Sequence, residues 1–159
     1  MPPSLHITTH IHTDGPIPGP HSLLTLTSTA FTGDGVLTGT FTTNVRELPG
    51  ATLHPTSLAD WRTRADDWLT TRRASRPPVL AMTDYARWID QLPGAATLVT
   101  DTARPDHLFL YWYLQRFIGR WPFAGTLADE GLHAYLDCTA HCSLSGCRTP
   151  HAAPLARTS

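Results

Sequence analysis

The stretch from His10 to Leu24, HIHTDGPIPGPHSLL, decides how the first part of the chain folds. The residues from Leu5 to Thr13 are rich in Thr and Ile and alternate loosely in polarity, which predicts a β-strand. The Gly and Pro residues that follow end this strand and predict a tight loop. Because residues i and i+2 of a strand share a face, His10 and His12 are expected to point the same way, next to that loop.

Two more strands are expected directly after the loop. The segment from His21 to Phe31 predicts a second strand, and Gly33, Asp34 and Gly35 supply turn residues that tolerate positive φ. Val36 to Val45 then predicts a third strand. The first third of the chain is therefore expected to form an antiparallel meander.

After Gly50 the hydrophobic period becomes helical, and helices are expected to alternate with strands. The expected segments are a helix over 58–69 with Thr56 or Ser57 as N-cap, a helix over 79–92, a strand over 96–100, a helix over 108–118 that is apolar nearly all round, a strand over 127–129 and a helix over 130–136. These segments predict an α/β fold, with a mixed sheet of three antiparallel and then parallel strands flanked by helices.

Composition limits the classes of function. The 159 residues suit one domain with a real core, and 41% of them are hydrophobic. Twelve basic residues balance thirteen acidic ones for a formal net charge of -1, so nucleic acid would have to meet a local basic patch. Every basic side chain is arginine, which suits bidentate contacts to anions, although codon bias in a GC-rich genome explains it equally well.

Three cysteines clustered near the C-terminus do not suggest a disulfide framework. The N-terminus lacks a signal-peptide pattern, and no uninterrupted apolar run approaches the length of a membrane span. We therefore expect a cytoplasmic protein that does not contact membranes.

Several blocks of the sequence, in one order, resemble the DEDD-type 3′-5′ exonucleases and exoribonucleases, close to ribonuclease T and oligoribonuclease in the ribonuclease H-like superfamily. These blocks are His10–Gly19, Leu48–Thr52, Trp61 with Trp68, Leu92–Gly94, Asp106–Leu114, Arg116–Phe117 and Gly119–Arg120. The resemblance implies a ribonuclease H-like exonuclease domain over residues 1–136. It fades in residues 137–159, which are expected to be an irregular tail that contains Cys and His and is truncated relative to the family.

The resemblance also implies where the chemistry of the family is located. Its members use carboxylates to hold two Mg²⁺ or Mn²⁺ ions about 4 Å apart. Where their first strand carries Asp-x-Glu, this chain has His10 and His12, so the active site is expected to be degenerate. Asp106 matches the third acid, and Asp129 matches a supporting acid. His151 matches the general base, but the last acid position is Ala156.

The resemblance implies a binding partner as well. The loop residues Asp14, Gly15 and Pro16 are expected to contact the 3′ end of single-stranded RNA or DNA, and related exonucleases often form homodimers.

The leading hypothesis is a catalytically impaired exonuclease-like protein that retains nucleic-acid binding. The competing hypothesis is an active nuclease or hydrolase that holds a transition metal through His10, His12 and Asp106. A third hypothesis is a truncated or decaying gene product with only a structural or partner-binding role.

Three further groups of residues allow two interpretations each. Cys138, Cys142 and Cys147 could join His151 in a zinc site, or they could be ordinary cytosolic thiols. The aromatic residues of 109–113 could stack on bases, but core packing explains them better. Arg72, Arg73 and Arg76 could contact phosphates, or they could complement the dipole of a helix C-terminus.

Overall fold

The computed structural model describes residues 3–145. Its sheet has five strands in the order β3-β2-β1-β4-β5. The strands are β1 (Ser4–Thr13), β2 (Leu23–Thr32), β3 (Leu37–Asn44), β4 (Ala95–Thr100) and β5 (Gly125–Ala128). β1, β2 and β3 pair antiparallel, whereas β4 pairs parallel with both β1 and β5. The predicted mixed sheet is therefore confirmed.

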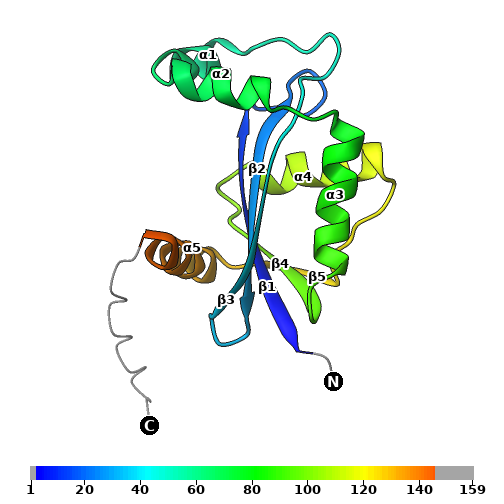
Figure 1. Cartoon of the computed structure of the whole chain (residues 1–159), viewed down its shortest axis with the longest axis vertical. Helices are drawn as coiled ribbons and strands as arrows, with labels where there is room; N and C mark the ends of the chain where they lie inside the picture. The colour runs from blue at the N-terminus through cyan, green and yellow to red at the C-terminus, as the bar shows by residue number, and fades with distance from the viewer. Residues whose placement is uncertain (1–2, 146–159) are drawn as a thin grey trace.

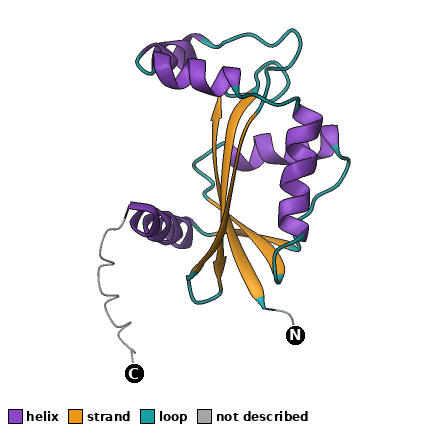
Figure 2. Cartoon of the chain, in the orientation of Figure 1, coloured by secondary structure: helices purple, strands orange, loops and turns teal. Residues whose placement is uncertain are grey.

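Helices cover both faces of this sheet (Figures 1 and 2). The helices are α1 (Pro55–Arg62), α2 (Ala65–Arg73), α3 (Pro78–Asp90), α4 (Asp106–Phe117) and α5 (Glu130–Ser145). α3 and α4 lie on one side of the sheet and α5 lies on the other, while α1 and α2 lie beyond the ends of β1 and β2 (Figure 1).

The alternation of β1 determines which side each residue faces. Ile7 and Ile11 join the core cluster that contains residues of α3 and α4. A second, smaller cluster joins Leu136 of α5 to Phe31 and Val99. Since successive residues of a strand point to opposite faces, His10 points away from the first core and toward α5. Burial on both sides thus fixes the direction in which this imidazole points.

Two expectations about the helix over 58–69 were wrong. The single helix expected over 58–69 is two helices, α1 and α2, because the chain leaves helical geometry at Arg64, where φ is -130°. α1 also begins earlier than expected. Pro55 occupies its first turn, and His54 Nδ1, rather than Thr56 or Ser57, accepts the capping bond, which comes from Thr56 N at 3.3 Å.

The segment after Leu136 was expected to be irregular, but α5 continues to Ser145. Asp129 starts this helix, since its Oδ1 accepts a hydrogen bond from Leu132 N at 2.9 Å. α4 is also less uniformly buried than expected, because Leu108 and Tyr111 are about half exposed while Phe109 and Tyr113 are fully buried. Across residues 3–145 we find no helix that is long and apolar enough to cross a membrane.

Candidate functional site

Three side chains from two elements meet on the α5 side of the sheet. His10 Nε2 of β1 lies 2.8 Å from Asp137 Oδ1, and His133 Nδ1 lies 3.2 Å from Asp137 Oδ2. His133 and Asp137 are four residues apart on α5, so they share one face of the helix. One potential ligand atom from each of the three residues lies within 4.8 Å of the others. We call these residues the His10–His133–Asp137 cluster.

The cluster is held by well-packed elements. His133 is 5% exposed and its ring meets that of His10 edge-on, with centroids 5.6 Å apart. Leu136, the neighbour of Asp137, is fully buried against the sheet. The strand and the helix thus hold the three donors together before any ligand binds.

Contacts within the cluster shift the pKa values of Asp137 and His133. Burial raises the pKa of Asp137, but the hydrogen bonds from His10 and His133 outweigh this effect and hold that pKa well below its usual range. The bond to Asp137 raises the pKa of His133, against the opposing effect of burial. Asp137 is therefore an anion near neutral pH, next to two imidazoles.

His12 shares a face with His10, as predicted, but it is not part of the cluster. Its ring lies edge-on to Trp61 of α1, with centroids 5.9 Å apart. Burial and the nearby Arg64 lower the pKa of His12, so the imidazole favours its neutral form. The predicted metal set of His10, His12 and Asp106 stays a prediction; the three ligand side chains that lie within 4.8 Å of one another among residues 3–145 are His10 and two residues of α5.

Asp106 begins α4 and lies beside the cluster. It lines, together with His133, Thr9 and Asp101, a cavity of about 10 Å³, which is room for one water-sized group. Burial raises the pKa of Asp106, and Arg104 and His10 oppose that shift. Asp106 Oδ2 is buried and accepts no hydrogen bond from any described residue, although Arg104 Nε lies 3.5 Å away.

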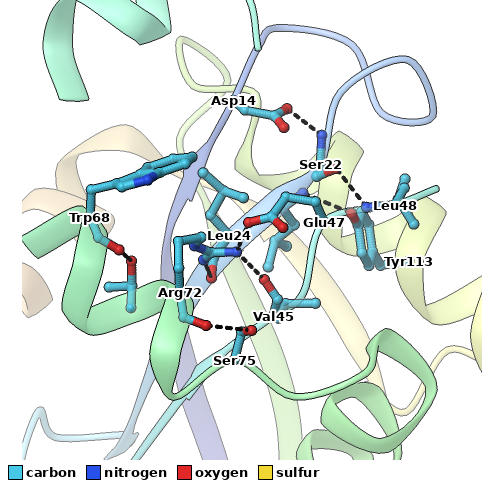
Figure 3. A network of polar contacts seen from close by, with 12 residues as sticks. Asp14, Ser22, Leu24, Val45, Glu47, Leu48, Trp68, Arg72, Ser75 and Tyr113 are labelled. Carbon is cyan, nitrogen blue, oxygen red and sulfur yellow. Dashed lines mark hydrogen bonds and ion pairs between the residues drawn. The ribbon is translucent and has the colours of Figure 1, made fainter. Parts of the chain in front are cut away.

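Asp14 has a structural role in the loop that was predicted to bind nucleic acid. It is 2% exposed, and its Oδ1 accepts a hydrogen bond from Ser22 N (Figure 3). Burial raises the pKa of this carboxyl group, and the Ser22 bond opposes the shift. Gly15 is also buried. The His21 ring lies so close to it that an added Cβ would be 2.2 Å from the ring, so no larger residue fits there. Of the three predicted contact residues, Pro16 is the exposed one.

Arg72 also proves to be a structural residue. Its guanidinium donates to Val45 O at 2.7 Å and Leu24 O at 2.8 Å, and it pairs with Glu47 (Figure 3). It therefore joins α2 to β2 and to the residue that follows β3, and it is not presented to a phosphate. The sequence signalled only a basic helix end.

Two predicted groups lie partly outside the described residues. Cys138 and Cys142 are on α5, but Cys147 and His151 are beyond Ser145, so the predicted zinc set and general base stay predictions. Within residues 3–145, no group of three metal-ligand side chains contains a cysteine.

Sequence reasoning missed His133 and Asp137. Their spacing of i and i+4 on a helix is a typical arrangement of paired metal ligands, as in the H-E-x-x-H motif. It was overlooked because residues after Leu136 were expected to be irregular. Chemically, two imidazoles and one carboxylate suit a single borderline ion such as Zn²⁺ better than a pair of Mg²⁺ ions, which prefer oxygen ligands.

The fold is similar to that of known nucleases. No protein-family profile matches the sequence, and a comparison with curated protein sequences found no match either. Solved structures do match, and they identify the architecture as the ribonuclease H-like fold of an exonuclease, which confirms the predicted fold class.

The particular proteins that share this fold include exonuclease I of E. coli. A product-bound exonuclease I has a TM-score of 0.61 and 10% identity over 89% of this chain. A metal-free E. coli exonuclease I with single-stranded DNA has a TM-score of 0.61 and 8% identity over 88% of this chain, and the zinc-bound form has a TM-score of 0.58. This chain covers only 30–32% of the length of those proteins.

Proposed function

We propose that this protein binds the end of single-stranded nucleic acid and does not hydrolyse it by the two-magnesium reaction that the resemblance implies. The observation that carries the proposal is the pair of imidazoles at His10 and His12, on the face of β1 that the resemblance assigns to metal-binding acids. The exonuclease fold supports the choice of ligand, since exonuclease I has been solved with single-stranded DNA.

The loss of hydrolysis follows from charge. Two-metal catalysis needs several carboxylates that hold two cations in a fixed arrangement. Here Asp106 and Asp137 share their surroundings with His10, His133 and Arg104. Imidazole is a poor ligand for Mg²⁺, and the Arg104 guanidinium repels a second metal ion.

The contacts for a strand lie next to His12, at the end of β1. A cavity of about 200 Å³ lies there, and its lining includes one acid as well as polar and aromatic residues: His12, Thr25, Trp61, Arg64, Asp67, Thr70 and Thr71. The Arg64 guanidinium lies 4.5 Å from the Trp61 ring centroid and also pairs with Asp60. Trp61 is only 4% exposed, so the guanidinium, and not the ring, is the part of this pair that a strand could reach. Arginine side chains commonly contact the phosphates of bound nucleic acid.

The test is binding and digestion of one 5′-labelled single-stranded RNA and the DNA of the same sequence. We expect saturable binding by fluorescence anisotropy that weakens with salt, and no shortening in Mg²⁺ or Mn²⁺. Arg64→Ala should weaken binding by about three- to tenfold and lower the salt slope by about one. Arg87→Ala, which removes an exposed arginine of α3, is the matched control and should leave binding unchanged.

Two outcomes would overturn the proposal. The absence of binding to either oligonucleotide would remove nucleic acid as the ligand. Stepwise shortening that disappears in Asp106→Ala would mean that the site is a working nuclease.

A separate variant tests whether the rest of the site is intact. If it is, restoring both acids in the double variant His10→Asp with His12→Glu should raise the affinity of the protein for Mg²⁺.

A metal-dependent hydrolase is the second candidate function. The convergence of His10, His133 and Asp137 favours it, because three protein ligands with one open position are typical of catalytic zinc sites. Digestion of the same oligonucleotides in Zn²⁺, lost in His133→Ala, would select this candidate over simple binding.

A further inference from the structure

The cluster on α5 has the ligand set and spacing of a transition-metal site. The donors are His10 Nε2, His133 Nδ1 and one oxygen of Asp137, all within 4.8 Å of one another. Zinc ligands lie about 2.0–2.2 Å from the ion, so neighbouring ligand atoms of a tetrahedral site are about 3.3 Å apart. The contact of 3.2 Å between His133 Nδ1 and Asp137 Oδ2 has this spacing, whereas His10 Nε2 lies 2.8 Å from the other oxygen, Oδ1. Small rotations of these side chains would bring one oxygen of Asp137 and both nitrogens to the spacing of a tetrahedral site.

We infer that His10, His133 and Asp137 bind one divalent transition-metal ion, with zinc preferred over magnesium. Nitrogen-rich ligand sets favour Zn²⁺, Co²⁺ and Ni²⁺, whereas Mg²⁺ and Ca²⁺ take oxygen ligands. This set differs from the carboxylates that the resemblance implies, because α5 contributes an imidazole and β1 contributes another.

Asp106 is the second observation that points to a ligand here. Its buried Oδ2 has an ion-pair partner in Arg104 Nε at 3.5 Å but accepts no hydrogen bond from the described residues. A buried carboxylate oxygen without a hydrogen bond is costly. Asp106 lines a cavity of about 10 Å³, and His133 is the member of the cluster that also lines it. Three protein ligands leave a fourth position of zinc for water, and a water on the His133 side would offer Oδ2 a hydrogen bond.

The opposing explanation is a clamp without metal, in which Asp137 accepts hydrogen bonds from His10 and His133 and so ties α5 to β1. The two explanations differ in what the ring nitrogens hold, which is a metal ion in one case and a proton in the other. A metal ion requires neutral imidazoles and releases protons when it binds, whereas the clamp needs no ion. Direct measurement of bound metal therefore separates them.

The experiment uses the untagged full-length protein, treated with EDTA and then dialysed against zinc. We expect about one zinc per chain by plasma mass spectrometry, and visible absorption bands typical of tetrahedral cobalt after replacement by Co²⁺. Asp137→Asn and His133→Ala should each weaken zinc binding by about 100-fold in competition with a chelating dye. Mg²⁺ at the same concentration should not displace the zinc.

Two control variants on the same helix complete the design. His141→Ala and Cys138→Ser change exposed metal-binding side chains outside the cluster and should keep full zinc binding. Asp137→Asn preserves the shape of the side chain, so circular dichroism of the EDTA-treated variant should match that of the parent. If His133→Ala fails to fold, Asp137→Asn and His10→Asn still test the site.

Several results would overturn the inference. Less than one-tenth of an equivalent of zinc, about the background of a non-specific surface, would leave the clamp as the explanation. Zinc that survives both Asp137→Asn and His133→Ala, or that is lost in Cys138→Ser, would place the metal elsewhere. All measurements are made without nucleic acid, so a failure here is distinguishable from a failure of the proposed binding function.

Discussion

His10 on β1 and Asp137 on α5 come from nearly opposite ends of the described chain, yet a 2.8 Å contact joins their side chains. This contact, together with the edge-on contact between the His10 and His133 rings, connects α5 to the strand at the centre of the sheet, while the His133–Asp137 contact lies within α5. α5 otherwise packs through the small cluster around Leu136. The polar contacts are therefore expected to contribute to the docking of this helix.

Asp137→Ala should destabilise the metal-free protein by about 1 kcal/mol, because two charge-assisted hydrogen bonds are lost in a partly solvated setting. The measurement is urea unfolding in EDTA at pH 6. His141→Ala, at an exposed position of α5, should change the free energy of unfolding by less than about 0.5 kcal/mol. Equal effects of the two substitutions would mean that the contacts do not hold α5.

Tyr85→Phe should cost about 1–2 kcal/mol of stability. Tyr85 is fully buried, its hydroxyl lies 2.8 Å from Ser28 Oγ, and Ser28 in turn donates to Thr8 O at 3.1 Å. Removing the hydroxyl deprives Ser28 of a partner inside the core. Tyr111→Phe is the matched control, since Tyr111 is about half exposed. Thermal unfolding of both variants measures the effect. Equal shifts of the two unfolding midpoints would mean that the buried hydroxyl network does not stabilise the core.

Arg72→Ala should destabilise the protein by about 2–3 kcal/mol, because Leu24 O and Val45 O both lose a charged donor. Arg73→Ala changes an exposed neighbour and should have almost no effect. Chemical unfolding gives the stabilities, and nucleic-acid affinity measured on the folded fraction should be the same for both variants. A selective loss of affinity in Arg72→Ala would favour the phosphate contact instead.

Local sequence patterns predicted where the strands and helices lie along the chain. The fold class was predictable from that order. Alternating Thr and Ile residues before a Gly-Pro loop identify β1, and the period change after Gly50 identifies the helices. The break at Arg64 was not predictable, because the apolar spacing of Trp61, Ala65 and Trp68 continues across it. Tertiary packing overrides a local pattern at such a position.

The candidate site was only partly predictable. Strand periodicity placed His10 and His12 on one face, but it could not show that they have different neighbours. The resemblance implied that Asp14 contacts nucleic acid, and Arg72 was expected either to contact phosphate or to complement a helix dipole. Their backbone contacts, to Ser22 and to Leu24, depend on segments that only the folded structure brings together.

The last prediction concerns Asp14 and pH. Burial raises the pKa of its carboxyl group above the ordinary value of about 4, so the folded state holds this proton more tightly than the unfolded state does. The resulting stability is present below the ordinary pKa and is lost as pH rises through the folded pKa. The side-chain amide introduced by Asp14→Asn does not titrate. The stability of the parent relative to this variant should therefore fall as pH rises from about 4 and then level off.

Urea unfolding of both proteins at pH values between about 3.5 and 7 measures this difference, because the slope of the unfolding free energy with pH reports the protons bound on folding. Asp66→Asn removes one exposed carboxylate and is the control, since a change common to both variants comes from the lost charge alone. If the parent instead gained stability over Asp14→Asn with rising pH, the bond from Ser22 N would outweigh burial. Asp14 would then act as a charged brace of the loop.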